Sequence, residues 1–137
     1  MSDQVWEGGC LCGAVRFRAR GAPTNATLCH CQSCRRASGA PFVAWVSFPR
    51  AGFGLIRGEP ARFRSSPPVE RSFCARCGTP LTYAHDAEPE SLDVVTVSLD
   101  RAGELAPRDH TWTSHALPWV RALDVLPRHP ERRGKGE

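Results

Sequence analysis

Long apolar runs and a strong excess of charge of either sign are both missing from this sequence. No stretch approaches the roughly 20 apolar residues that a membrane-spanning helix needs, so we expect no membrane segment. Residues 1–6 show neither the basic nor the apolar region of a secretory signal, which predicts a cytoplasmic location. The formal net charge of +4 does not by itself indicate a nucleic-acid partner, because phosphate binding needs Lys and Arg clustered on one surface.

Internal repeats, low-complexity tracts and strong helix signals are absent as well. The 137 residues fit a single domain, and 12 Gly and 12 Pro divide the chain into short segments that favour strands. At residues 15–20, apolar side chains alternate with Arg, a pattern typical of a half-buried strand with a basic outer face. One short helix is predicted at residues 32–38, and further strands at residues 42–48, 61–65, 71–73, 80–84 and 92–99.

Together these segments predict an all-β domain with long loops and short helical turns over residues 1–126. Residues 127–137 are polar and show no periodicity, so we expect a mobile C-terminal tail there. Such a domain is compatible with many functions, and function must therefore be argued from the reactive residues.

Cysteine occurs seven times, and an odd number excludes a complete set of disulfides within one chain. In a reducing cytosol free thiols persist, so metal or redox chemistry is the better prediction. The cysteines fall into three groups: Cys10 with Cys12, Cys29 with Cys31 and Cys34, and Cys74 with Cys77.

The first and third groups share a glycine directly after their second cysteine, at Gly13 and Gly78. In a metal-binding knuckle this position often needs a positive φ, and a residue without Cβ lets backbone N–H groups approach the thiolates. The two pairs therefore look like the halves of one structural zinc site, with the ligands Cys10, Cys12, Cys74 and Cys77. The alternatives are unmetallated buried thiols or a redox pair, which would want a βαβ setting that this strand-rich sequence does not show.

The middle group places three thiols within six residues, where one metal ion could bind Cys29, Cys31 and Cys34. If the other four cysteines are already used, this ion keeps a vacant fourth position, which distinguishes catalytic from structural zinc. A histidine could instead close the site, and the candidates are His30, His85, His110 and His115.

An open three-cysteine site favours thiol substrates over hydrolysis. Three thiolates on Zn²⁺ leave a local charge of about −1, so the ion is a weaker Lewis acid than one bound by neutral imidazoles. Thiolates suit zinc well, and an incoming thiol could replace bound water and be held deprotonated. Arg35 and Arg36 follow the group, and they either attract an anionic thiol or form a solvated basic turn.

Three linked cysteine motifs, at residues 9–13, 29–40 and 71–78, resemble those of the glutathione-dependent formaldehyde-activating enzyme (Gfa) and centromere protein V family. The resemblance covers residues 6–119, with the motifs in the same order. It implies an Mss4-like fold of antiparallel sheets and two zinc ions per chain, one structural and one catalytic, in agreement with the division of cysteines above.

The resemblance also implies an activity, that of a carbon–sulfur lyase. The family's named reaction condenses glutathione with formaldehyde to S-hydroxymethylglutathione and reverses that step. By analogy, the catalytic residues are the ligands of the second zinc ion, which would hold the glutathione thiolate: Cys29, Cys31 and Cys34. One position departs from the family's pattern, which often has Ser-Lys before a late Pro-Trp. Here Ser114 is followed by His115, a residue mostly neutral at pH 7, ahead of Pro118 and Trp119.

A zinc-stabilised binding module for protein or nucleic acid is the alternative function, suggested by Arg16, Arg18, Arg20 and four Trp. Acidic residues interrupt the second half of the chain, and seven deprotonated cysteines with two Zn²⁺ would lower the net charge from +4 to about +1. We therefore expect a small thiol and an aldehyde as partners, with nucleic acid disfavoured. A redox sensor is a weaker alternative, because it needs a low-pKa thiolate without a metal.

Several aromatic residues near the cysteines have two interpretations. Phe42, Trp45 and Phe48 either wall the site or fill the core, and we expect at least two of them in the core. Tyr83 and His85 are predicted at a strand end on the surface rather than in a pocket.

Overall fold

Residues 4–134 are described by the computed structural model of the chain. They form one α-helix, α1 (Gln32–Ser38), and ten strands: β1 (Val5–Gly9), β2 (Arg16–Arg20), β3 (Thr24–Cys29), β4 (Val43–Pro49), β5 (Phe53–Arg57), β6 (Ala61–Ser66), β7 (Val69–Phe73), β8 (Pro80–His85), β9 (Ser91–Val95) and β10 (Asp109–Thr111). Short 3₁₀ segments connect or follow them: η1 (Arg50–Gly52), η2 (Thr96–Ser98), η3 (Ala102–Glu104), η4 (Thr113–His115) and η5 (Pro118–Val125).

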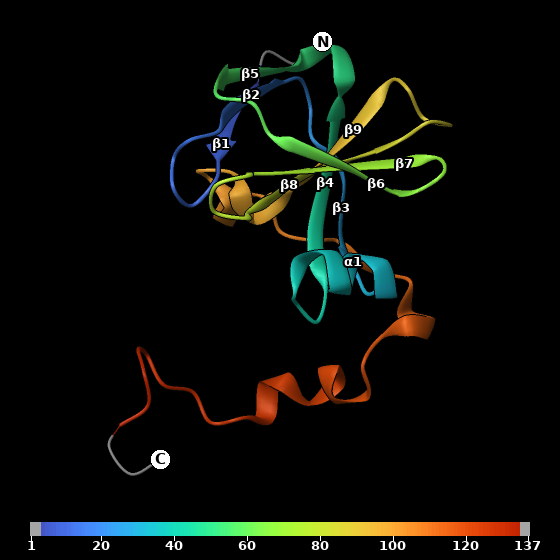
Figure 1. The fold of residues 1–137 in the computed structure, drawn as a ribbon. Coiled ribbons are helices and arrows are strands. Elements are labelled where there is room, and N and C mark those ends of the chain that lie inside the picture. Colours follow the sequence, from blue (N-terminus) through green and yellow to red (C-terminus); the bar gives the residue numbers. More distant parts are fainter. Residues whose placement is uncertain (1–3, 135–137) are drawn as a thin grey trace.

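The strands form two sheets, one of three strands and one of seven (Figure 1). The smaller sheet has the order β1-β2-β5, and the larger has the order β10-β3-β4-β9-β8-β7-β6. Neighbouring strands are antiparallel except β10, which pairs with β3 in parallel. The β-rich fold of antiparallel sheets predicted from the sequence is therefore confirmed, with one parallel pair at the edge.

The main core lies between the two sheets. Phe17 and Ala19 of β2 are buried against Val46 and Phe48 of β4, because side chains on alternate positions of a strand point to the same face. Trp45 and Ser47 occupy the other positions of β4 and point to the opposite face. That second face of the larger sheet is where the three-cysteine group and its cavity lie, as described below.

Helix α1 follows β3 directly and covers the end of β3 and β4 (Figure 1). The Cys31 sulfur caps its N-terminus by accepting from the Cys34 N–H at 3.2 Å. Gly39 ends the helix with a φ of 68°, and its N–H donates to the Arg35 carbonyl. The predicted helix at residues 32–38 is thus confirmed, with a metal-ligand candidate as its cap.

The predicted strands at residues 15–20, 42–48, 61–65, 71–73 and 80–84 all correspond to strands of the structure. The prediction for residues 92–99 is wrong at its end, because β9 stops at Val95 and residues 96–98 form a 3₁₀ turn. The sequence analysis did not find β1, β3, β5 and β10. These strands are three to six residues long, and in β1, β5 and β10 Gly or polar residues break the apolar alternation on which the prediction depended.

The C-terminal part of the chain extends away from the two sheets (Figure 1). Residues 127–134 of the predicted tail are exposed and lie outside helices and strands, and residues 135–137 of it lie outside the described residues. Residues 1–3, part of the segment in which no secretory signal is predicted, also lie outside the described residues. Among the described residues, no helix has the length and apolar character needed to span a membrane.

Candidate functional site

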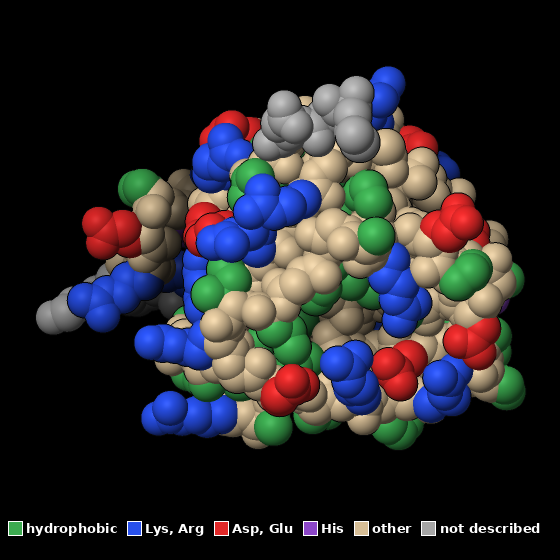
Figure 2. Space-filling model, turned by 90° about the horizontal axis from the view of Figure 1, so that it is seen from above, with side chains coloured by type: hydrophobic (Ala, Val, Ile, Leu, Met, Phe, Trp, Pro, Cys, Tyr) green, Lys and Arg blue, Asp and Glu red, His purple; other side chains and the backbone are tan. Residues whose placement is uncertain are grey.

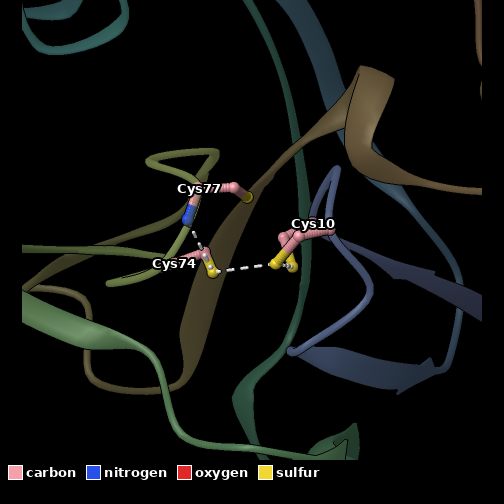
Figure 3. Close-up of side chains that lie close together, drawn as sticks. Cys10, Cys74 and Cys77 are labelled. Carbon is pink, nitrogen blue, oxygen red and sulfur yellow. Dashed lines mark hydrogen bonds between the residues drawn. The ribbon is translucent and has the colours of Figure 1, made fainter.

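The first cysteine group combines two turns that lie 62 or more residues apart in the chain. Cys10 and Cys12 lie in the turn after β1, and Cys74 and Cys77 lie in the turn after β7 (Figure 3). Each turn is held by backbone donors to sulfur. The Val15 N–H donates to Cys10 Sγ at 3.2 Å, and the Cys77 N–H donates to Cys74 Sγ at 3.4 Å. The fold therefore brings the turn after β1 and the turn after β7 together at one point.

The spacing of these four sulfurs fits a tetrahedral metal site. All four Sγ atoms lie within 4.8 Å of one another. The Cys10–Cys12 and Cys12–Cys74 sulfur distances are 3.6 and 3.8 Å. Four thiolates bound to zinc at about 2.3 Å would be about 3.8 Å apart, so the donor set and its spacing both fit zinc.

Thr79 connects the two turns of this site. Its hydroxyl oxygen accepts from the Leu11 N–H at 3.0 Å and contacts Cys77 Sγ at 3.2 Å. The hydrogen bond from the Thr79 hydroxyl lowers the pKa of Cys77 to about 5, with the Thr79 backbone N–H as the next contribution. A sulfur that is deprotonated at neutral pH is ready to bind a metal ion.

Gly13 and Gly78 have φ values of 79° and 83°, as the knuckle interpretation predicted. A Cβ added at Gly78 would contact no atom within 4 Å, so only the backbone conformation disfavours a side chain there. We expect Gly78→Ala to lower the free energy of unfolding by about 1–2 kcal/mol. Gly54 on β5 is the matched control, since it has open space for a Cβ and no positive φ.

Chemical denaturation of the two zinc-loaded variants measures this difference. Gly54→Ala should change the free energy of unfolding by less than about 0.5 kcal/mol. An equal loss in both variants would contradict a conformational requirement at Gly78.

The second group brings Cys29, Cys31 and Cys34 together at the junction of β3 and α1. Their Sγ atoms lie within 4.8 Å of one another, with Cys29 and Cys34 buried and Cys31 half-buried. Among the described residues, no fourth His, Cys, Asp or Glu ligand atom falls within this group. The residues fit a metal ion with three protein ligands and an open fourth position.

The four histidines considered as a fourth ligand are engaged elsewhere. His30 is 1% exposed, and its Nε2 lies 2.9 Å from Nδ1 of His110. His85 Nδ1 accepts from the Ala87 N–H, while His115 Nδ1 lies 3.4 Å from the Gln32 backbone N–H that donates to it. His115 is thus placed beside the three-cysteine group without joining it.

The thiols of Cys29 and Cys34 have pKa values shifted in opposite directions. The hydrogen bond with Cys34 lowers the pKa of Cys29 to about 7, against the effect of burial. The same bond, together with burial, raises the pKa of Cys34 above its usual range. Cys29 is therefore the sulfur most easily deprotonated, and metal binding would have to displace the proton of Cys34.

Arg71 of β7 is the functional candidate that the sequence analysis missed. Its Nη1 and Nη2 atoms lie 3.8 and 3.7 Å from Cys34 Sγ, and its guanidinium lies 5.1 Å from the Tyr83 ring centroid. Arg71 comes 37 residues after Cys34, and only the pairing of β7 with β8 and β9 places it near α1. The sequence offered one signal, its position in the third cysteine motif.

An open cavity of about 500 Å³ lies beside the three-cysteine group. Its walls come from the exposed face of the larger sheet, from the start of α1 and from residues 111–115. The lining includes the three cysteines of this group, together with Ser47, Arg71, Tyr83, Glu88 and Asp93.

The aromatic residues divide between core and cavity. Phe48 is in the main core, whereas Trp45 is buried beside the cysteines and also lines the cavity. Phe42 is half-buried, with its ring centroid 5.2 Å from that of His30. The surface prediction for Tyr83 is wrong, because this residue is half-buried and lines the cavity next to Trp45.

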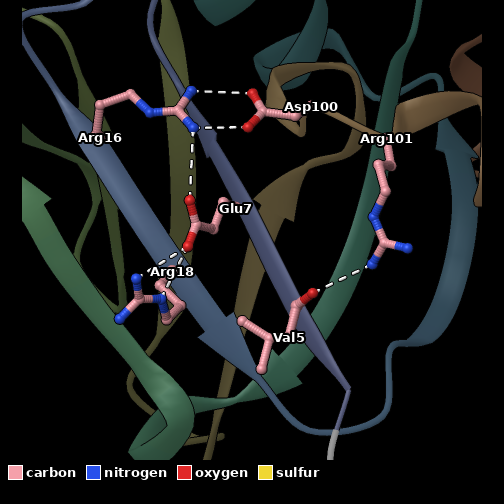
Figure 4. A network of polar contacts seen from close by, with 6 residues as sticks. All are labelled: Val5, Glu7, Arg16, Arg18, Asp100 and Arg101. Atoms are coloured by element: carbon pink, nitrogen blue, oxygen red, sulfur yellow. Dashed lines mark hydrogen bonds and ion pairs between the residues drawn. The ribbon is translucent and has the colours of Figure 1, made fainter.

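Two of the three arginines of β2, Arg16 and Arg18, are paired with carboxylates (Figure 4). Arg16 forms two hydrogen bonds to Asp100, at 2.9 and 2.6 Å, and Arg18 contacts Glu7 at 2.9 Å. Blue and red side chains also lie interspersed on the face shown in Figure 2. The basic outer face predicted for this strand is present, but neighbouring carboxylates offset the charges of Arg16 and Arg18, which disfavours phosphate binding there.

Arg35 contacts the backbone between two of the cysteines rather than their sulfurs. Arg35 Nε donates to the His30 carbonyl at 3.3 Å, so this side chain supports the loop that carries the group. Of the four Trp, Trp6 and Trp45 are buried, whereas Trp112 and Trp119 are more than half exposed.

A β-rich fold with a four-sulfur group and a separate three-sulfur group beside a cavity defines a class of β-domains with two unequal candidate metal sites. Comparison with known proteins identifies the family. The chain belongs to the glutathione-dependent formaldehyde-activating enzyme family, whose model matches residues 5–115. The family predicted from the three motifs is thereby confirmed.

Individual relatives share about a third or less of their aligned residues with this chain. An uncharacterized lyase of Schizosaccharomyces pombe is 32% identical over 80 residues, which are 58% of this chain and 58% of that protein. A candidate glutathione-dependent formaldehyde-activating enzyme of Halomonas elongata is 28% identical over 123 residues, covering 83% of this chain and 78% of that protein. The crystal structure of a Rhodobacter sphaeroides protein superposes with a TM-score of 0.64 at 22% identity, over 77% of this chain and 99% of the other, and supports the fold.

Proposed function

We propose that the protein is a zinc-dependent carbon–sulfur lyase that joins a thiol to an aldehyde, and reverses that step, at the three-cysteine group. The observation that carries the proposal is the geometry of Cys29, Cys31 and Cys34. Their sulfurs converge, lack a fourth ligand among the described residues and open into a cavity. A zinc ion bound there would supply one free coordination position, at which a substrate thiol is held as its thiolate.

The reaction requires a thiolate nucleophile and a positive group that stabilises the negative charge developing on the carbonyl oxygen. The thiol sulfur bonds to the carbonyl carbon, the carbonyl π bond breaks, and the proton lost by the thiol ends on the former carbonyl oxygen. Arg71 lies against Cys34 Sγ and offsets the charge of about −1 that three thiolates and one Zn²⁺ leave. Its fixed charge would also stabilise the negative oxygen that develops as the carbon–sulfur bond forms.

The four-sulfur group has a different role in this proposal. Cys10, Cys12, Cys74 and Cys77 would hold a structural zinc ion, because all four positions are taken by protein sulfurs. Two zinc ions per chain follow from this division. The thiol is glutathione and the aldehyde formaldehyde on the evidence of family membership, and we propose a cytoplasmic location for the reaction.

Cobalt substitution tests the open site directly. In protein loaded with two Co²⁺ ions, we expect titration with 2-mercaptoethanol or glutathione to change the thiolate-to-cobalt charge-transfer absorption in a saturable way. The closed four-sulfur site supplies a constant background. If no thiol changes this absorption, the three-cysteine site is not open to thiols and the proposed function is wrong.

A further inference from the structure

The end of the cavity away from the cysteines carries a carboxyl group. Cys29 of β3 pairs with Val43 of β4, and Asp93 of β9 pairs with Ser47 of β4. Val43 and Ser47 are four residues apart on one strand, which corresponds to about 13 Å and to the same face of the sheet. Cys29 and Asp93 therefore mark two ends of one sheet face, and both line the same cavity.

Asp93 has a polar partner but no cationic one. Ser47 Oγ donates to Asp93 Oδ1 at 2.6 Å. Among the ion pairs of residues 4–134, none includes Asp93, and a second carboxylate, that of Glu88, lines the same cavity. Burial raises the pKa of Asp93, with Glu88 adding to the effect. A half-buried carboxylate beside a second one is stabilised by a positive charge, which the ligand would have to supply.

Arg71 does not supply the positive charge beside Asp93, because its guanidinium lies between Cys34 and the Tyr83 ring. The cavity thus presents three features in order along the sheet: sulfurs at one end, a guanidinium near them, and uncompensated carboxylates at the other end. A complementary ligand carries a thiol, a negative group near the thiol, and a positive group farther away.

We propose that Asp93, assisted by Glu88, determines thiol specificity by receiving the ammonium group that the substrate carries about 10 Å from its sulfur. The inference rests on the proposed function and adds a specificity determinant to it. In an extended γ-glutamyl-cysteinyl thiol, eight bonds separate the sulfur from the α-amino nitrogen, a reach of about 10 Å. A metal–sulfur bond and a hydrogen bond to the carboxylate extend this reach to about 15 Å. Cys29 and Asp93 lie on opposite sides of β4, about 13 Å apart along it and two strand spacings apart across it, which is a diagonal of about 16 Å.

The test compares two thiols that differ only in the ammonium group, glutathione and its analogue with glutarate in place of the γ-glutamyl residue. Affinities are read from the charge-transfer absorption of the cobalt-loaded protein, without reference to turnover. For the unmodified protein we expect glutathione to bind about 10- to 100-fold more tightly than the analogue. Asp93→Asn should remove that preference by weakening glutathione binding while leaving the analogue within about threefold.

Two further variants keep the test independent of folding. Glu88 is exposed, so Glu88→Gln leaves the fold intact and should weaken glutathione binding alone, by about two- to fivefold. Glu90 is an exposed carboxylate outside the cavity lining, and Glu90→Gln should change neither affinity by more than about twofold.

The outcomes separate this inference from the proposed function. If both thiols bind with equal affinity, or if Asp93→Asn weakens both equally, Asp93 does not recognise an ammonium group and the inference is wrong while the thiol site stands. If neither thiol nor 2-mercaptoethanol changes the absorption, the proposed function fails and the inference fails with it.

Discussion

Replacement of Cys74 by serine should leave the protein without a cooperative fold at 25 °C. Cys74 is 1% exposed and belongs to the main core, and its sulfur lies 3.8 Å from that of Cys12. Structural zinc sites contribute about 10–16 kcal/mol to folding, whereas a domain of this size is stable by about 5–15 kcal/mol. Loss of one of four ligands therefore removes a free energy comparable to the whole stability.

Near-ultraviolet circular dichroism and thermal unfolding measure this loss, and zinc content is determined on the same samples. Thr79→Val is the milder comparison, because it keeps all four sulfurs but removes the hydroxyl that joins Leu11 to Cys77. We expect that variant to fold with two zinc ions and to lose about 1–3 kcal/mol of stability. A Cys74→Ser protein that unfolds cooperatively near the unmodified midpoint would show that the four-sulfur group is not a structural metal site.

Replacement of Cys31 by serine should have the opposite profile, with the fold kept and the activity lost. Serine is a good N-cap, so its hydroxyl can accept the Cys34 N–H that the Cys31 sulfur now accepts, and α1 should still begin at Gln32. A neutral hydroxyl does not replace a thiolate on zinc. We expect zinc to fall from two ions to one per chain.

The rate consequence is large because the thiol substrate loses its site of activation. We expect kcat/KM for thiol–aldehyde interconversion to fall by about 10³-fold, or about 4 kcal/mol of transition-state stabilisation. Steady-state kinetics with glutathione and formaldehyde, together with zinc analysis, gives both quantities. A variant that keeps one zinc ion, a normal melting temperature and full activity would rule out the three-cysteine group as the reactive centre.

These two predictions depend on a division of cysteines that was visible in the sequence. The turns around Cys10 and Cys74 are local structures, in which backbone N–H groups a few residues away donate to sulfur. Gly13 and Gly78 follow for the same local reason, since the chain must turn with a positive φ after the second ligand. Local geometry of this kind is encoded by spacing and residue type alone.

The pairing of surface charges could not be predicted from the sequence. Arg16 and Arg18 were correctly predicted on the outer face of a strand, and their alternation with buried residues is plain in the sequence. Their partners, however, lie 84 residues later at Asp100 and on the neighbouring strand at Glu7. The alternation could not reveal that these charges are balanced, because strand pairing and loop position decide which groups meet.

The sequence by itself determined the β-rich class, the helix at residues 32–38, the two cysteine groups and the family, because these depend on periodicity and on spacing within short motifs. Only the tertiary structure decided what surrounds the three-cysteine group. Arg71 reaches Cys34, and Asp93 reaches the same cavity, through the order and register of strands far apart in the chain. Register is fixed by burial of whole sheet faces, a property of the folded molecule that no single segment carries.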